Sequence, residues 1–157
     1  VIANLPYNSA TKMLINWLQH INDFQSLTLM FQKEVADRIL AKPGSKSYGR
    51  LSVITNWLSE TTKLFDVPNS AFIPKPKVNS TVIKIKPYKK PLHDVSFSSL
   101  EKITKIIFNQ RRKMIKTSLK ELDGCNILSE LKISPLLRPE QLSIEDFCRI
   151  AKKVFEK

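Results

Sequence analysis

Two kinds of hydrophobic pattern occupy two parts of this chain, and they constrain its fold more than any other feature. Up to about Lys86, short apolar runs typical of strands alternate with segments whose apolar residues recur at helical spacing. From Pro87 to His93 prolines and lysines interrupt this pattern, and only helical patterns follow. Because strands separated by helices build layered structures, we predict an α/β domain over residues 1–88 and a small all-α domain over residues 89–157.

The expected elements follow from apolar spacing and from turn and capping residues. The predicted strands cover residues 1–3, 26–31, 63–67 and 80–85. The predicted helices begin after Asn8 or Ser9, at Gln32 and at Leu51, and further helices are expected near residues 100–107, 115–122 and 147–155, with a break near residues 109–111. Ser143 followed by Asp146 predicts a capping box at the start of the last helix.

The segment Asn4-Leu5-Pro6-Tyr7 follows the first predicted strand directly. In open α/β sheets ligands bind at the carboxyl ends of strands, so this position favours a binding or catalytic role. The alternative is a simple turn in which Asn4 and Pro6 redirect the chain and Tyr7 packs. Because the chain begins inside an expected strand and without an initiator Met, we also expect sequence upstream of Val1 in the natural protein.

The charge of the chain indicates an anionic partner. Lys and Arg number 26 against 14 Asp and Glu, which gives a formal net charge of +12, and 42% hydrophobic residues are typical of a globular protein. A basic protein without a nucleic-acid partner is the alternative. The distant Cys125 and Cys148 and the isolated His20 and His93 do not form a metal-ligand pattern, and we find no signal peptide or membrane span. We therefore predict a cytoplasmic protein without a metal or membrane partner.

Five segments together carry a resemblance to a known family. They are NLPY at residues 4–7, FQKEVADRI, GSKSYGRLSV, AFIPKPKVNS at residues 71–80 and FNQRRK. In this order, over nearly the whole chain, they resemble the KsgA family of ribosomal RNA adenine dimethyltransferases. The resemblance implies the C-terminal half of a Rossmann-like methyltransferase sheet followed by a small helical RNA-recognition domain. FQKEVADRI and RRK are more similar to KsgA than to the related Erm enzymes.

The resemblance also implies roles for individual residues. The side-chain oxygen of Asn4 and the backbone carbonyl of Pro6 would accept hydrogen bonds from the adenine amine, while Tyr7 and Phe72 would stack on its ring. The methyl donor would be S-adenosylmethionine, which Asn4 would also touch. The three glycines of the chain form no glycine-rich strand-to-helix turn, so we expect the main donor-binding loop to lie upstream. The chain alone would then bind the donor weakly.

The implied partners are small-subunit ribosomal RNA and the immature small ribosomal subunit, bound by a monomeric enzyme that dimethylates adenines. Basic residues in loops and after a predicted helix would contact RNA phosphates. They are Lys42, Lys46, Arg50, Lys75, Lys77, Arg111, Arg112 and Lys113. For the last three, a solvated helix face is the alternative. Two other functions stay open: a ribosome-assembly factor that binds RNA without catalysis, and an Erm-like enzyme that acts on large-subunit RNA.

Overall fold

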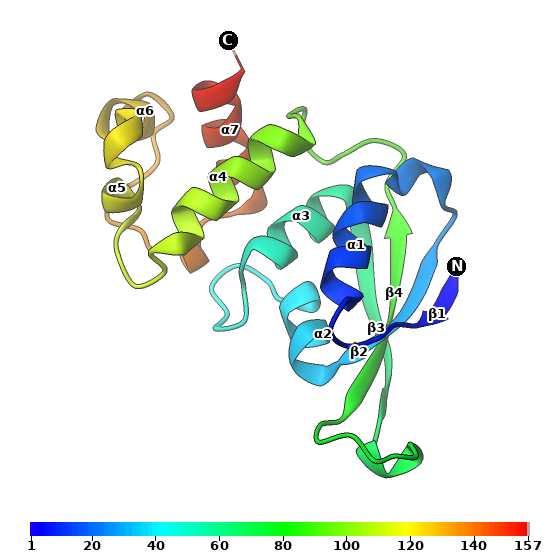
Figure 1. Cartoon of the computed structure of the whole chain (residues 1–157). Coiled ribbons are helices and arrows are strands. Elements are labelled where there is room, and N and C mark those ends of the chain that lie inside the picture. The colour runs from blue at the N-terminus through cyan, green and yellow to red at the C-terminus, as the bar shows by residue number, and fades with distance from the viewer. Residues whose placement is uncertain (157) are drawn as a thin grey trace. The chain divides into compact units, whose positions relative to one another are not determined.

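The computed structural model describes residues 1–156, which form two compact units (Figure 1). The first unit contains residues 1–40 and 58–91, and the second contains residues 41–57 together with the residues from Leu92 onward. This division differs from the predicted boundary after residue 88. Residues 41–57, expected within the α/β domain, group with the C-terminal helices because their buried side chains pack there.

The first unit is built on a mixed sheet with the strand order β1-β2-β4-β3. Its strands are β1 (Ile2–Asn4), β2 (Leu27–Gln32), β3 (Ser59–Val67) and β4 (Ser80–Pro87). Strand β1 runs parallel to β2, whereas β4 runs antiparallel to both β2 and β3. All four predicted strands are present. Strand β3 begins earlier than predicted because its polar residues 59–62 lack an apolar signal but still pair with β4.

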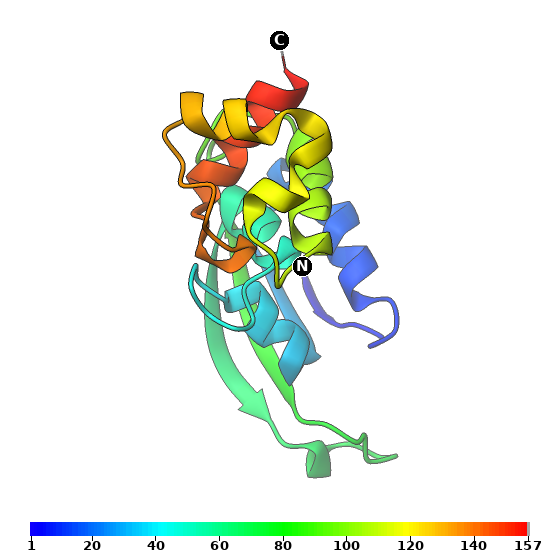
Figure 2. The same ribbon diagram turned by 90° about the vertical axis from the view of Figure 1, so that its left-hand side faces the viewer.

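Helices α1 (Ala10–Gln19) and α2 (Lys33–Leu40) lie on one side of this sheet (Figures 1 and 2). Helix α2 packs on β2, β3 and β4 and buries Ala36 and Ile39. The inward residues of β2 alternate along the strand, as expected for a sheet with one covered face, and are fully buried: Leu27, Leu29 and Phe31. The short helix η1 (Ile21–Asp23) connects α1 toward β2. Strand β1 is the outermost strand of the described sheet, beside β2.

Strands β3 and β4 form a long twisted hairpin whose connection carries a short helix, η2 (Asn69–Ala71), at its end (Figure 2). A bulge between Lys63 and Phe65 interrupts the pairing and increases the local twist. The base of the connection is closed because the backbone N–H of Asn69 donates to Oδ1 of Asn79, at 2.9 Å. The segment between these two residues is thereby held as a defined loop.

The second unit is helical. It contains α3 (Arg50–Leu58) except its last residue, α4 (Phe97–Asn109), α5 (Ile115–Ser118), α6 (Gly124–Glu130), α7 (Ile144–Phe155) and the short helices η3 (Lys120–Leu122) and η4 (Pro139–Gln141). Helix α4 packs against α7, and the side chains of Leu100, Ile103 and Phe147 are fully buried. The predicted helix over 115–122 is two short helices, because the backbone turns at Leu119.

The predicted capping box at the start of α7 is confirmed. The backbone N–H of Asp146 donates to Oγ of Ser143, and the backbone N–H of Ser143 donates to Oδ2 of Asp146, both at 3.0 Å. These two bonds satisfy donors that the first helical turn otherwise leaves without partners. The local sequence pattern was therefore sufficient to place this helix start.

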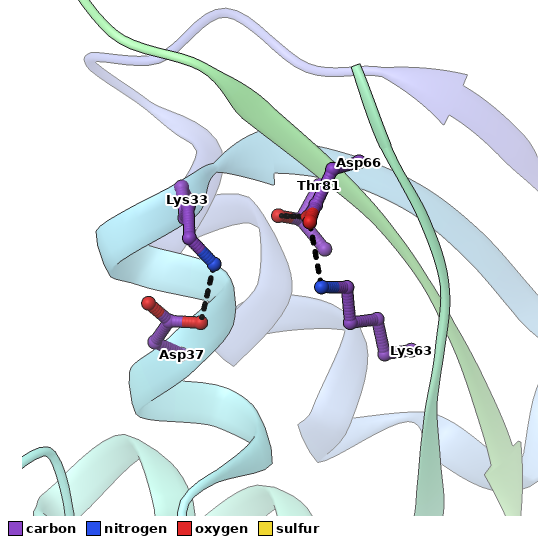
Figure 3. A network of polar contacts seen from close by, with 5 residues as sticks. All are labelled: Lys33, Asp37, Lys63, Asp66 and Thr81. Atoms are coloured by element: carbon purple, nitrogen blue, oxygen red, sulfur yellow. Dashed lines mark hydrogen bonds and ion pairs between the residues drawn. The ribbon is translucent and has the colours of Figure 1, made fainter. Parts of the chain in front are cut away.

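A polar network near the bulge links β3 to β4 (Figure 3). Oδ1 of Asp66 accepts a hydrogen bond from the hydroxyl of Thr81 at 2.6 Å, and its Oδ2 accepts from Nζ of Lys63 at 2.7 Å. On α2, Lys33 pairs with Asp37 at 3.4 Å. The hydrogen bond from Lys63, followed by that from Thr81, lowers the pKa of Asp66 below its usual value. Asp66 is thus stabilised in its charged form.

This network predicts an acid-dependent contribution to stability. Because the pKa of Asp66 is lower in the folded state than in the unfolded state, its contribution is present above the usual carboxyl pKa of about 3.9 and is lost as the pH falls through the folded value. Urea unfolding of wild type and Asp66→Asn should therefore differ above about pH 5 and converge as the pH falls below about 3.9. The difference should be small because the pair is exposed. A difference that grows in acid would contradict this assignment.

Candidate functional site

The segment Asn4-Leu5-Pro6-Tyr7 leaves the sheet at the carboxyl end of β1. Asn4 is the last paired residue of the parallel β1–β2 ladder, opposite Met30. Leu5 is 4% exposed and anchors the turn in the core, whereas Asn4 and Pro6 are exposed and Tyr7 is partly buried. The polar side chain and the aromatic ring are therefore presented at the surface from a rigid base.

These four residues line one open hollow together with part of the hairpin loop. The loop residues that line it are Phe72, Ile73, Pro74 and Pro76. All four residues predicted to be catalytic, namely Asn4, Pro6, Tyr7 and Phe72, thus lie at the same place, although 65 residues of sequence separate Tyr7 from Phe72. Leu5, Ile73 and the two prolines were part of the recognised motifs but were not predicted as site residues. These residues line the hollow because the folded hairpin brings its loop next to the end of β1.

A hydrogen bond joins the two motifs directly. The hydroxyl of Tyr7 and Oγ of Ser80 are 2.5 Å apart, and Ser80 is fully buried at the start of β4. Ser80 is also the last residue of the AFIPKPKVNS segment. A hydrogen bond at the far end of the phenol ring holds the direction of the side chain and leaves the faces of the ring available for stacking. Sequence reasoning did not predict this contact.

The backbone carbonyl of Pro6, which was predicted to accept from the adenine amine, takes part in the start of a helix. It accepts hydrogen bonds from the backbone N–H groups of Ser9 and Ala10, at 3.1 and 2.9 Å, and so begins helix α1. A carbonyl oxygen has two lone pairs, and both are used here. The side chain of Ser9 makes no capping bond to α1, so Pro6 supplies the acceptor that a side-chain cap usually provides.

The carbonyl of Leu5 is the neighbouring acceptor at the same hollow. Within residues 1–156, no hydrogen bond to this carbonyl is present, and Leu5 lines the hollow beside Asn4. The side chain of Asn4 likewise makes no hydrogen bond within the described part of the chain. Two adjacent hydrogen-bond acceptors, the side-chain oxygen of Asn4 and the carbonyl of Leu5, are therefore available at the end of β1.

The basic residues predicted to bind RNA lie in both units. In the first unit, Lys75 and Lys77 are exposed on the loop that carries Phe72. In the second unit, Lys42, Lys46 and Arg50 are exposed on and beside the loop before α3, and Arg111, Arg112 and Lys113 are exposed after α4. Arg111 donates to the backbone carbonyls of Lys46 and Tyr48, the latter at 2.8 Å, so the two basic groups of the second unit are adjacent.

Other kinds of site find little support in the structure. Residues 1–156 contain no cluster of three or more potential metal ligands, and none of their helices is long and apolar enough to cross a membrane. Cys148 is buried, and burial raises the pKa of its thiol to about 12, which disfavours a reactive thiolate. The hollow at the end of β1, where Asn4, Tyr7 and Phe72 meet, is the principal candidate for chemistry.

Comparison with known proteins identifies the family. A protein-family model described as "Ribosomal RNA adenine dimethylase" matches residues 1–156. The chain belongs to the ribosomal RNA adenine dimethylase family. It is 50% identical to the ribosomal RNA small subunit methyltransferase A of Rhodospirillum rubrum and 53% identical to that of Ehrlichia ruminantium, over 98% and 96% of this chain. It covers only 54% and 58% of those relatives, so it spans about half of their length.

Solved structures agree with this membership in the dimethylase family. A dimethyladenosine transferase from Plasmodium falciparum matches 95% of this chain and 64% of its own with a TM-score of 0.83 and 26% identity. The 23S rRNA methyltransferase ErmE matches 98% of this chain and 64% of its own with a TM-score of 0.63 and 19% identity, a likeness of fold alone. The predicted methyltransferase-type α/β fold is thereby confirmed.

The hydrogen bond between Tyr7 and Ser80 yields a test that needs no substrate. Tyr7→Phe and Ser80→Ala remove the same bond, so each should lower the free energy of unfolding by about 1 kcal/mol, and the double variant by about the same amount. Urea unfolding of the four proteins measures this.

The control pair is Ser80→Ala with Tyr88→Phe. Ser80 is the first residue of β4, and Tyr88 comes directly after its last residue. Eight residues of strand separate these two positions by roughly 26 Å, so their effects should add. If Tyr7→Phe and Ser80→Ala also add, the two hydroxyls are not bonded to each other.

Proposed function

We propose that this chain carries the base-binding part of an S-adenosylmethionine-dependent dimethyltransferase that acts on adenines of small-subunit ribosomal RNA. The observation that carries the proposal is the convergence of Asn4, Tyr7 and Phe72 on one hollow at the carboxyl end of β1. The names of the relatives, ribosomal RNA small subunit methyltransferase A, support the small-subunit target. The enzyme would act in the cytoplasm as a monomer on the immature small subunit.

The two acceptors at this hollow match what adenine methylation requires. The exocyclic amine of adenine is a poor nucleophile because its lone pair is delocalised into the ring. Hydrogen bonds from its two N–H groups to acceptors favour the pyramidal amine and stabilise the positive charge that develops on nitrogen. We assign these acceptors to the side-chain oxygen of Asn4 and the carbonyl of Leu5, the latter replacing Pro6.

The aromatic side chains supply the affinity for the base. Tyr7, held by Ser80, would stack on one face of an adenine taken out of its stack, and Phe72 would stack on the other. Each base–aromatic contact contributes about 1–3 kcal/mol, which offsets much of the cost of unstacking the nucleotide. Lys75 and Lys77, exposed on the Phe72 loop, would neutralise phosphates next to the extruded base.

Among residues 1–156, Asn4 is the residue that we expect to contact the methyl donor. The hollow measures 240 Å³, below the roughly 300–1,000 Å³ of pockets that enclose a whole ligand, and its lining suits one flat ring. Gly44 and Gly49 lie in the loop before α3 and Gly124 begins α6, so none of the glycines described here lies in the turn that follows β1. When bound, S-adenosylmethionine supplies an electrophilic methyl group. We assign to Asn4 the orientation of the adenine amine toward this methyl group.

Two other functions are less well supported. An assembly factor that binds RNA without catalysis needs the basic residues but not the two free acceptors beside Tyr7 and Phe72. An Erm-like enzyme would use the same chemistry on large-subunit RNA. The names of the relatives, ribosomal RNA small subunit methyltransferase A, favour a small-subunit target over this alternative.

Asn4→Ala in the full-length protein separates the catalytic proposal from RNA binding alone. Loss of a contact that forms as charge develops should lower the single-turnover methylation rate on the order of 10²–10³-fold at saturating donor, with RNA affinity little changed. Donor affinity must be measured alongside because Asn4 is also expected to touch the donor.

The matched control is Asn8→Ala, an exposed asparagine that does not line the hollow. Asn8→Ala should methylate at the wild-type rate. If Asn4→Ala does so as well, the catalytic role of the NLPY segment is wrong, and the alternative of a simple structural turn should replace it.

A further inference from the structure

We propose that Arg111 is a positioning residue: its guanidinium holds the basic loop formed by residues 42–50 in the conformation that contacts RNA. The part of this inference that concerns RNA rests on the function proposed above. The part that concerns the loop rests on the structure of the second unit alone.

The contacts of Arg111 are all directed to this loop. Its Nη2 donates to the carbonyl of Lys46 and, at 2.8 Å, to the carbonyl of Tyr48. Both hydrogens of that nitrogen are thereby used on neutral backbone acceptors that lie 65 and 63 residues away in sequence. Within the described residues no acidic group lies within ion-pair distance of Arg111, so the bonds fix the loop without neutralising the charge.

Two further anchors hold the loop on the same unit. The ring of Tyr48 is fully buried and makes an edge-to-face contact with the ring of Phe108, with the ring centroids 6.1 Å apart. The ring of Phe108 in turn stacks on that of Phe147, with the ring centroids 5.2 Å apart. The backbone N–H of Gly44 donates to the carbonyl of Glu140 at 2.6 Å. The φ of Gly44 is +87°, a conformation that favours glycine. Lys46 lies between these two anchors in the loop, and the hydrogen bond from Arg111 to its carbonyl holds this part of the loop.

This arrangement gives adjacent arginines different tasks. Among residues 1–156, the side chains of Arg112 and Lys113 make neither hydrogen bonds nor ion pairs, and both are exposed. They are available to phosphates, as are Lys42, Lys46 and Arg50. Two segments more than 60 residues apart in sequence therefore supply the cations of the second unit, and the hydrogen bonds of Arg111 hold the two segments next to each other.

The first experiment measures the loop without RNA. Hydrogen–deuterium exchange of the amides of residues 44–49 is compared in full-length wild type, Arg111→Ala and the matched control Arg112→Ala. Loss of two hydrogen bonds from a charged donor should speed exchange of these amides about tenfold or more in Arg111→Ala. Arg112→Ala should exchange as wild type does. Unchanged exchange in Arg111→Ala would overturn the proposal.

The second experiment is a double-mutant cycle on affinity for a small-subunit ribosomal RNA fragment. If Arg111 positions Lys46, Lys46→Ala should cost little further affinity in the Arg111→Ala background but its full effect in the Arg112→Ala background. Arg112→Ala should remove one phosphate contact. The slope of the logarithm of the binding constant against the logarithm of the salt concentration should therefore become shallower by about 0.7–0.9.

Additive effects of Arg111→Ala and Lys46→Ala would overturn the positioning role and make Arg111 an independent phosphate contact. If none of these variants changes RNA affinity, the RNA surface proposed above is wrong. The exchange measurement still decides whether Arg111 holds the loop.

Discussion

The change from strand to helix within five residues, from Leu5 to Ser9, is the constraint on which the candidate site depends. Parallel pairing with β2 holds the backbone up to Asn4, and the carbonyl of Pro6 then accepts the first N–H groups of α1. Leu5 is buried between these two anchors. The backbone that carries the side chain of Asn4 and the carbonyl of Leu5 is consequently held by main-chain hydrogen bonds, which contributes to the preorganisation that a charge-stabilising site needs.

The hairpin of β3 and β4, which lies far from Asn4 along the chain, contributes the remaining residues of the site. Its loop brings Phe72 to the hollow, and Ser80 at the base of β4 fixes the ring of Tyr7. The loop itself is closed by Asn79, whose side chain accepts from Asn69. Two aromatic side chains and two backbone-positioned acceptors thus converge because strand pairing brings distant segments together. Their arrangement suits a flat base with an amine at its edge.

Local patterns predicted those features that depend on neighbouring residues. Apolar spacing placed the strands and most helices, and Ser143 with Asp146 placed the start of α7. The bonds of Arg111 to the loop could not be predicted, since they join residues more than 60 positions apart. The grouping of residues 41–57 with the C-terminal helices has the same cause, because the burial of Tyr48 against Phe108 leaves no periodic signal.

The candidate site itself was predicted from motifs and from family resemblance, and the structure changed its details. The motif indicated Pro6 as an acceptor, but a sequence does not show which carbonyl a helix start uses. The hydroxyl of Tyr7 likewise gave no sign of its partner, because Ser80 lies 73 residues further on. Tertiary hydrogen bonds, which the sequence pattern does not encode locally, decide these assignments.

We propose that an adenine base binds between Tyr7 and Phe72, which line the same hollow. Photo-crosslinking tests it most directly: the full-length protein is irradiated with a small-subunit ribosomal RNA fragment that carries 8-azidoadenosine in place of adenosine, and the modified peptides are identified by mass spectrometry. We expect adducts on the peptides that contain Tyr7 or Phe72, and we expect excess unmodified RNA to suppress them. Competable adducts on other peptides, with none at these two residues, would contradict it.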